Sequence, residues 1–250
     1  MMVKALESRL VEWCREAGVE IDCGTAGMLW RYFCELSRRN KKMNLVSRQP
    51  DSVILRKHFV DSVTCVPLLP GRTGLKLIDI GSGAGFPGMV IKIVRNDITV
   101  DLLESVRKRC GFLEEIISIL GLSGVSAVHG RAEEIAHLDE FRGGYDIVTC
   151  RAVSSLVTDL EYGLPFLRVG GLMIVQKGRG AGKELGDADG VMRILGGRLK
   201  EVKKLVLPGG REKRTIPVIM KESLTPPVYP RRSGIPARRP LRAENVPRGT

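Results

Sequence analysis

LKLIDIGSGAGFPG, residues 75–88, is the stretch that decides the fold of this chain. Its first six residues are mostly Leu and Ile, which is typical of a buried strand. A glycine-rich turn follows, and Pro87 fits the first turn of a helix that we expect to run to Arg95. A buried strand that passes through such a turn into a helix indicates an α/β protein with a ligand site at the turn.

The glycines of the turn limit which ligand it can hold. Gly81, Gly83 and Gly85 alternate along the chain and permit a tight turn whose backbone comes close to a ligand. The N–H groups at the start of the next helix would then face a carboxylate or a ribose. Phe86 stands where a dinucleotide-binding turn has its third glycine, so the sequence disfavours a nicotinamide-dependent oxidoreductase.

Around this turn, short Val- and Ile-rich runs alternate with helical segments. The expected strands are LKLIDI (75–80), ITVDLLE (98–104), VSAVHG (125–130), YDIVTC (145–150) and GLMIVQK (171–177). KEVKKLVLPGG (200–210) and REKRTIPVIMKE (211–222) are typical of an antiparallel hairpin that closes the sheet at its edge. The pattern predicts a Rossmann-like α/β fold with a seven-stranded, mostly parallel sheet.

The chain divides into three expected regions. Apolar residues at helical spacing predict a helical N-terminal cap over residues 1–70, which a Pro/Gly joint separates from the sheet. Residues 71–222 form the α/β domain. Residues 223–250 are rich in Pro and Arg and poor in apolar residues, so we expect an extended basic tail.

Composition points to a polyanionic partner. The 250 residues carry a formal net charge of +12, which suits RNA, DNA or an anionic membrane. The six cysteines show no C-x-x-C spacing and there are three histidines, so we expect reduced thiols and no metal site. No apolar run reaches the roughly 20 residues of a membrane helix, and the start does not resemble a signal peptide. We therefore expect a soluble, cytoplasmic protein that acts as a monomer.

Acidic residues at two further strand ends complete the outline of a ligand. Glu104 ends the second strand, where a carboxylate can accept hydrogen bonds from both ribose hydroxyls. Ala132 and Glu133 follow the third strand, where an adenine ring would lie between backbone N–H groups and apolar side chains. With the glycine turn, they outline S-adenosylmethionine. The alternative for Glu104 is a surface acid beside Arg107 and Lys108 that caps the next helix.

Motifs spread over most of the chain resemble one family, the bacterial ribosomal RNA small subunit methyltransferase G family, also called glucose-inhibited division protein B. They are LKLIDIGSGAGFPG (75–88), LLESVRKRCGFL (102–113), GRAEE (130–134), DIVTCRAVSSL (146–156), QKG (176–178), RRNKKMNLVS (38–47), RKHFVDS (56–62), RTIPVIMK (214–221) and YPRRSGIPARRPL (229–241). The resemblance implies a class I S-adenosylmethionine-dependent methyltransferase domain in residues 71–222.

The resemblance also implies a reaction. It implies methyl transfer to N7 of guanine 527, in the 530 loop of bacterial 16S rRNA, with that rRNA or the small ribosomal subunit as partner. The cofactor contacts that it implies are Gly81, Phe86, Glu104, Ala132, Glu133 and Arg151. Cys150 stands where we expect a serine in the family, which affects the pocket near the methyl group.

Guanine N7 carries a free lone pair, so its attack on a sulfonium methyl needs alignment and desolvation but no general base. The chain has TCRAVSS after the fourth strand, not the Asn/Asp-Pro-Pro-aromatic motif of many amino-group methyltransferases. Arg151 is the candidate catalytic residue: its guanidinium suits a phosphate, the Hoogsteen edge of guanine or the cofactor. The alternative is a structural ion pair with Asp79 or Asp146.

Basic residues outside the turn are candidates for RNA contacts, although each also fits a solvated surface. They are Arg38 and Arg39 in the RRNKK run, Lys177 at the end of the fifth strand, and Arg231 and Arg232 in the tail. The tail itself could become ordered on rRNA. His58 could reach over the pocket from the cap, but we interpret it as a structural residue and not a catalytic one.

Two other functions remain open at this point. Cytosine-C5 RNA methyltransferases use a cysteine near this strand end as a nucleophile, and Cys150 is the only candidate here. A non-catalytic ribosome-assembly factor could keep the fold and bind rRNA without an intact set of Gly81, Glu104 and Arg151.

Overall fold

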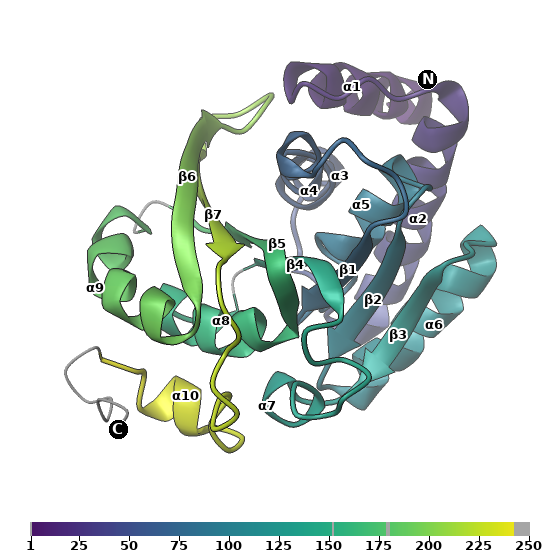
Figure 1. Ribbon diagram of the computed structural model, residues 1–250. Coiled ribbons are helices and arrows are strands. Elements are labelled where there is room, and N and C mark those ends of the chain that lie inside the picture. Colours follow the sequence, from purple (N-terminus) through teal and green to yellow (C-terminus); the bar gives the residue numbers. More distant parts are fainter. Residues whose placement is uncertain (1, 152, 179–180, 243–250) are drawn as a thin grey trace, which may run out of the picture.

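The computed structural model describes residues 2–151, 153–178 and 181–242. Its centre is a seven-stranded sheet in the order β3-β2-β1-β4-β5-β7-β6 (Figure 1). The strands are β1 (Lys76–Ile80), β2 (Thr99–Glu104), β3 (Val125–His129), β4 (Tyr145–Arg151), β5 (Leu167–Gln176), β6 (Gly197–Val206) and β7 (Lys213–Lys221). The expectation of a seven-stranded, mostly parallel sheet is confirmed, since among the described strands β7 alone runs opposite to the other six.

The two strands of the expected hairpin are present and form the antiparallel edge of the sheet, with β6 outermost. β7 is not at the edge of the sheet: it lies between β5 and β6 and pairs antiparallel with both. The chain leaves β5 through a helix and returns as β6 one position further out, so the gap between them receives β7. The sheet is thereby closed on this side by β6, a long and largely exposed strand.

Helices cover both faces of the sheet (Figure 1). They are α1 (Met2–Glu16), α2 (Cys23–Met43), α3 (Asp51–Ile54), the π-helix η1 (Leu55–Val60), α4 (Asp61–Val63), η2 (Val66–Leu68), α5 (Gly88–Val94), α6 (Arg107–Leu120), α7 (Ala132–Ile135), α8 (Leu156–Gly163), η3 (Leu164–Phe166), α9 (Ala181–Ile194) and α10 (Ile235–Arg238).

Successive side chains of a strand point to opposite faces of the sheet, so each strand contributes residues to two hydrophobic clusters. In β5, Ile174 packs in the cluster with the N-terminal helices and α5, whereas Met173 and Val175 pack with α8 and α9 on the other face. The N-terminal cap therefore has no separate core, because its buried residues belong to the same cluster as one face of the sheet. Among the described residues, none of the helices combines the length and apolar character needed to cross a bilayer.

The turn between β6 and β7 reaches the N-terminal cap (Figure 1). Arg56 of η1 forms an ion pair with Glu212, and Gly209, at φ 68°, lies so close to the indole of Trp13 that a Cβ would collide with it. Further along β7, Arg214 Nε lies 2.9 Å from each carboxylate oxygen of Asp61 in α4. The hairpin thus fixes the cap over the carboxyl end of the sheet.

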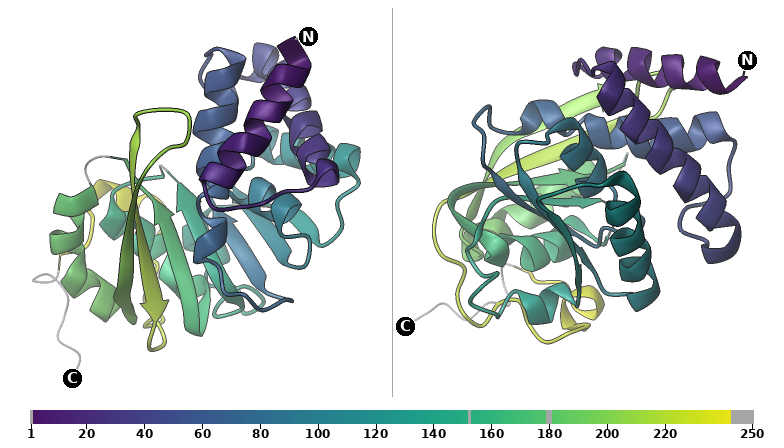
Figure 2. Two further views of the ribbon diagram at one scale, coloured as in Figure 1. Left: turned by 90° about the horizontal axis from the view of Figure 1, so that it is seen from above. Right: turned by 90° about the vertical axis from the view of Figure 1, so that its right-hand side faces the viewer.

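The C-terminal segment is packed, and the expectation of an extended arm is wrong for its described part. Residues 223–242 run along α7 and α8 at the end of the molecule opposite the N-terminal helices (Figure 1 and Figure 2). Tyr229, Pro230 and Leu241 are buried there. Arg231 and several carbonyl oxygens of this segment find partners on the α/β domain that composition does not reveal. Residues 243–250 lie outside the described residues.

Candidate functional site

The glycine turn lies where the strand order reverses, since β1 has β2 on one side and β4 on the other. Doubly wound sheets bind their ligands in the crevice at this point. Gly81, Gly83 and Gly85 have φ of 66°, 60° and 99°, so the tight turn expected from the sequence is present. The N–H of Ser82 donates to Leu103 O at 3.1 Å, which joins the turn to β2.

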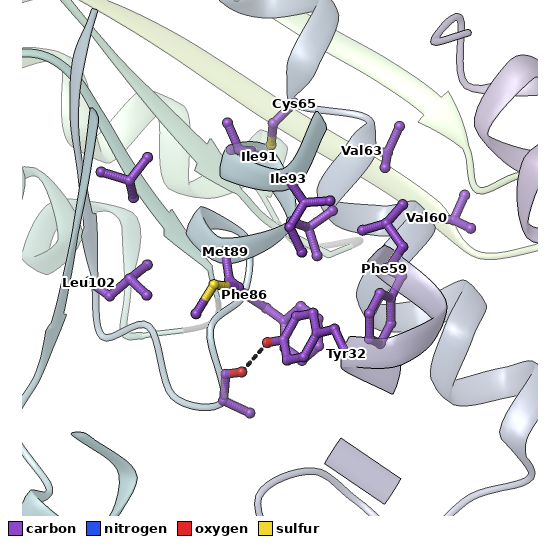
Figure 3. Close-up of a cluster of buried hydrophobic side chains, with 14 of the residues drawn as sticks. Tyr32, Phe59, Val60, Val63, Cys65, Phe86, Met89, Ile91, Ile93 and Leu102 are labelled. Atoms are coloured by element: carbon purple, nitrogen blue, oxygen red, sulfur yellow. Dashed lines mark hydrogen bonds between the residues drawn. The ribbon is translucent and has the colours of Figure 1, made fainter. Parts of the chain in front are cut away.

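Phe86 closes the turn on the side of the cap. It is 3% exposed and stacks on Tyr32 of α2, with ring centroids 5.6 Å apart. The Tyr32 hydroxyl donates to Ala84 O (Figure 3). A Cβ on Gly85 would lie 2.5 Å from that hydroxyl oxygen, so only glycine fits. These contacts with α2 of the cap thereby fix the conformation of the glycine turn.

Gly88 is a residue of the site that the sequence reasoning missed. A Cβ at Gly88 would lie 2.6 Å from Leu102 and 2.7 Å from Asp79, so α5 can approach the sheet only with glycine here. This is the packing role of the third glycine in a dinucleotide motif, moved two residues beyond Phe86. The sequence does contain a signal for this role, since Gly88 directly follows Pro87 and is another candidate for the third glycine of the motif.

Two buried carboxyls support the turn. Asp79 Oδ2 accepts from the Gly88 N–H at 3.0 Å and its Oδ1 accepts from the Thr149 hydroxyl at 2.7 Å. Burial raises the pKa of Asp79 to about 6. Glu104 Oε2 accepts from the Gly83 N–H at 2.9 Å and its Oε1 accepts from the Val106 N–H at 2.8 Å. Glu104 is 4% exposed, so it is not the surface acid of the alternative interpretation.

Two hollows meet at Gly81. The smaller has a volume of about 170 Å³ and lies at the ends of β1, β2 and β3. It is lined by Ile80, Gly81, Leu103, Ser105, Gly130, Arg131, Ala132, Glu133, Val153 and Tyr162. The Glu133 carboxylate does not point freely into it, because its Oε1 accepts from the Gly234 N–H of the tail at 2.8 Å.

The larger hollow, about 840 Å³, lies between the cap, the glycine turn and the ends of β4, β5 and β7. Its basic lining residues are Arg48, Lys57, Arg109, Arg151, Lys177 and Arg214. Asp61 is the one acid among the described lining residues. We call this space the basic hollow.

Residues 26–215 match the family described as GidB, rRNA small subunit methyltransferase G. Relatives with that name from Moorella thermoacetica and Acetivibrio thermocellus are 40% and 41% identical over 93% and 94% of this chain, and the matches cover 97% of each relative. The chain belongs to the rRNA small subunit methyltransferase G family. It is an S-adenosylmethionine-dependent methyltransferase.

Solved structures of distant proteins show the same fold. The YcgJ protein from Bacillus subtilis gives a TM-score of 0.50 at 11% identity, over 66% of this chain and 100% of its own. The [4+2]-cyclase SpnF gives 0.50 at 15% identity, over 65% of this chain and 81% of its own. At such low identity these similarities concern the fold alone.

The residues of this methyltransferase fit its cofactor. Gly81 lies between the two hollows, and a Cβ there would lie 2.9 Å from Val153, so the glycine leaves the backbone free to line both spaces. Each carboxylate oxygen of Glu104 keeps a second lone pair for a hydroxyl donor. Ala132 and Tyr162 give the smaller hollow the apolar surface that an adenine ring requires.

Arg151 of the methyltransferase lies in the basic hollow at the end of β4. Its guanidinium carbon is 5.2 Å from the centroid of the Phe86 ring. NH1 donates to Lys57 O at 3.0 Å, and NH2 lies 3.0 Å from His58 Nδ1. The side chain keeps 17% of its surface exposed, so part of the guanidinium faces the hollow. Cap and glycine turn together hold this cation in one place.

The ion-pair partner of Arg151 is Asp61, 3.7 Å away, and neither Asp79 nor Asp146, the two acids suggested by the sequence. The sequence did not reveal this pair because α4 of the cap folds back over β4. Asp61 is 3% exposed and also binds Arg214.

His58 is neutral in this environment. Burial, and then the positive charge of Arg151, lower the pKa of His58 to about 3. Its Nδ1 then accepts from Arg151, which assigns the proton to Nε2. This agrees with the interpretation that His58 has a structural role, and its effect is to orient the candidate catalytic arginine.

Lys177 does not have the exposed position expected of a phosphate-binding lysine. It is 8% exposed, and its Nζ lies 2.5 Å from Asp159 Oδ2 and 3.6 Å from Glu184 Oε2. It also donates to Ser154 O, in the segment after β4. The expectation of a solvated lysine is therefore wrong, because two acids from α8 and α9 surround the end of β5.

The other candidate RNA contacts lie apart from the basic hollow. Arg38 is 60% exposed and pairs with Glu35, and Arg39 pairs with Glu115 of α6. Arg232 is exposed. Arg231 is paired with the buried carboxylate of Glu161, so the exposed position expected of an RNA contact is not found; the contact itself stays a prediction. The sequence reasoning missed Arg48, Lys57, Arg109 and Arg214 as a group, since they come from three distant parts of the chain: the cap, α6 and β7.

Cys150 does not have the properties of a nucleophile. It is 1% exposed, and burial raises the pKa of its thiol well above the ordinary value. A nucleophilic cysteine needs access and thiolate character. Within the described residues, no group of three or more His, Cys, Asp or Glu side chains is arranged to hold a metal ion.

Proposed function

We propose that this protein transfers the methyl group of S-adenosylmethionine to N7 of guanine 527 in the 530 loop of 16S rRNA. The observation that carries the proposal is the basic hollow beside the glycine turn, in which Asp61 is the one acid among the described lining residues. That acid is occupied by Arg151 and Arg214. The hollow thus suits an anionic substrate whose reacting atom needs no proton removed.

The chemistry of the site supports a ring nitrogen over an exocyclic amine. An amine must lose a proton during methylation, which calls for a base. His58, with a pKa of about 3, is a poor base near neutral pH. Guanine N7 already has its lone pair, so alignment and exclusion of water are enough.

Different residues would bind the cofactor and the target guanine. The glycine turn, Glu104 and the wall around Ala132 would hold the adenosine and amino-acid parts of the cofactor. When bound, S-adenosylmethionine supplies an activated methyl group on a sulfonium. Arg151 would donate to O6 of the guanine, the acceptor beside N7 on the Hoogsteen edge. Lys57 O and His58 hold the guanidinium in place for this contact.

The basic hollow and its rim would bind the rRNA backbone. Arg48 and Arg109 are exposed and line the hollow, where they can meet phosphates. Exposed Arg38 and Arg232 remain candidates for contacts further from the target guanine. We propose that the protein acts in the cytoplasm as a monomer, with 16S rRNA in the small ribosomal subunit as its partner.

The test is incubation with labelled S-adenosylmethionine and small subunits that lack the modification, followed by nuclease digestion and mass identification of the methylated nucleoside. A single 7-methylguanosine at position 527 would support the proposal. Methylation of another atom or position would contradict it, and 5-methylcytidine would direct attention back to Cys150. Arg151→Lys should lower kcat, because a lysine cannot reproduce the planar guanidinium fork.

A further inference from the structure

The C-terminal segment and the smaller hollow share a wall. α7 begins at Ala132, which lines that hollow, and Glu133 lines both the hollow and a groove of about 830 Å³ under the tail. Tyr162 of α8 completes the wall. Burial, and then the charge of Glu133, raise the pKa of Tyr162 to about 12. Contacts that fix the positions of α7 and α8 therefore also fix the shape of the smaller hollow, which is the space proposed for the adenine.

The tail holds α7 through successive contacts. The N–H of Gly234 donates to Glu133 Oε1 at 2.8 Å, and the hydroxyl of Ser233 donates to Glu134 Oε1 at 2.8 Å. His137 Nε2 lies 2.8 Å from Pro230 O. A helix of four residues has little stability of its own. Its position must come from such contacts.

The tail holds α8 through the hydrogen bond from the Thr158 hydroxyl to Pro236 O, at 3.2 Å, and through an ion pair to a buried carboxylate. Glu161 is fully buried, and its two oxygens receive Arg231 Nε at 2.8 Å and Arg231 NH2 at 2.7 Å. The backbone N–H of Arg231 donates to Glu161 Oε1 at 2.9 Å. Such a bidentate pair fixes orientation as well as distance. Tyr162, the next residue of α8, lines the hollow.

Arg142 fastens the start of this segment. Its guanidinium donates to the carbonyl oxygens of Thr225 at 3.0 Å and Tyr229 at 2.9 Å. The same group donates to Ala136 O, at the end of α7, at 3.0 Å. The tail is thus joined to α7 at both ends of that helix. In Figure 1 the tail and α10 lie beside α7 and α8.

We propose that residues 225–239 act as a brace that positions the adenine side of the cofactor site, with Arg231 as its main positioning residue. The inference rests on the proposed placement of S-adenosylmethionine in the two hollows. By linkage, the docked tail and the bound cofactor then stabilise one another by the same free energy. The brace acts on cofactor affinity and leaves the basic hollow, where rRNA is proposed to bind, unchanged.

The first test is calorimetric titration of Arg231→Gln with S-adenosylhomocysteine. We expect its affinity to fall roughly tenfold, within the usual range of such couplings. Arg238→Gln is the matched control, since Arg238 is exposed in the same segment and the charge change is equal. In steady-state assays, the KM for S-adenosylmethionine should rise while kcat and the KM for small subunits stay unchanged. Equal affinities for folded Arg231→Gln and wild type would overturn the brace.

The second test uses the wild-type chain and does not depend on whether the variant folds. Hydrogen exchange with and without S-adenosylhomocysteine should show slower exchange of the Gly234 and Ile235 amides, with the Leu207 amide of the hairpin turn as internal reference. Cofactor binding without added protection in the tail would overturn the inference alone. No binding of S-adenosylhomocysteine by wild type would overturn the proposed cofactor site itself.

Discussion

Glu104 illustrates how one side chain at the carboxyl edge acts on two loops. Its two oxygens accept from Gly83 in the glycine turn and from Val106 at the start of α6. The sequence placed Glu104 correctly at the end of β2. It could not show that both oxygens already bind backbone N–H groups, because these contacts depend on the conformation of two loops.

Glu104→Gln should weaken cofactor binding roughly ten- to a hundredfold. The glutamine amide has one accepting oxygen, so a backbone N–H of the turn loses its acceptor, at a cost of about 1–3 kcal/mol. Titration with S-adenosylhomocysteine measures the effect. Glu114→Gln, at an exposed position of α6, is the control. Unchanged affinity would remove Glu104 from the cofactor site.

Asp79 makes stability depend on pH. Its folded pKa of about 6 lies above the ordinary 3.8, so between these values the folded chain binds a proton that the unfolded chain lacks. The free energy of unfolding should fall as pH rises through this window, by about 3 kcal/mol relative to Asp79→Asn. Urea unfolding at pH 4 to 7 checks the difference. Asp139→Asn, at an exposed position, should follow wild type.

At the scale of elements, periodicity predicted the parallel strands well. β1 and β2 begin one residue inside the expected ranges, and β3 begins where expected. β5 begins at Leu167, four residues before the expected Gly171. Residues 167–170 join it through a register shift opposite Tyr145, which an apolar pattern does not encode. The place of β7 was also hidden, because strand order depends on long-range pairing.

The pair between Arg214 of β7 and Asp61 of α4 should stabilise the docking of the cap. Arg214→Gln leaves buried Asp61 with Arg151 at 3.7 Å. A buried charge left wholly unpaired costs about 3 kcal/mol or more, and the variant should lose part of this because Arg151 remains. We expect a lower free energy of urea unfolding. Lys213→Gln, an exposed neighbour, should change stability by less than about 0.5 kcal/mol. Equal stabilities of the two variants would show that the pair contributes little.

At the scale of the whole molecule, the arginines that contribute to the formal charge of +12 have different roles. Arg231 and Arg142 are occupied within the fold. The exposed arginines at the basic hollow are free to meet a polyanion. Composition indicated a polyanionic partner, which agrees with membership of an rRNA methyltransferase family. It also suggested that the tail arginines contact RNA, because it could not reveal the buried acids that hold the tail, which are about 70 to 100 residues away in the chain.

The salt dependence of RNA binding should separate these groups. For Arg48→Gln combined with Arg109→Gln, we expect weaker binding of a 530-loop RNA and a salt slope reduced by about 1.5, as for two lost phosphate contacts. Fluorescence anisotropy between about 50 and 200 mM salt measures the slope. Arg15→Gln combined with Arg193→Gln removes the same charge at exposed positions outside the hollow. An equal decrease in both would indicate a general charge effect.

The ion pair between Arg214 of the β6–β7 hairpin and Asp61 of the cap also has a consequence for biosynthesis. Asp61 is translated 153 residues before Arg214. The cap therefore leaves the ribosome long before the strand that fastens it, and its contacts with β7 are among the last to form. Completion of the fold must wait for β7, so nascent chains stalled before β7 should be more sensitive to proteases and should bind chaperones more than the full chain does.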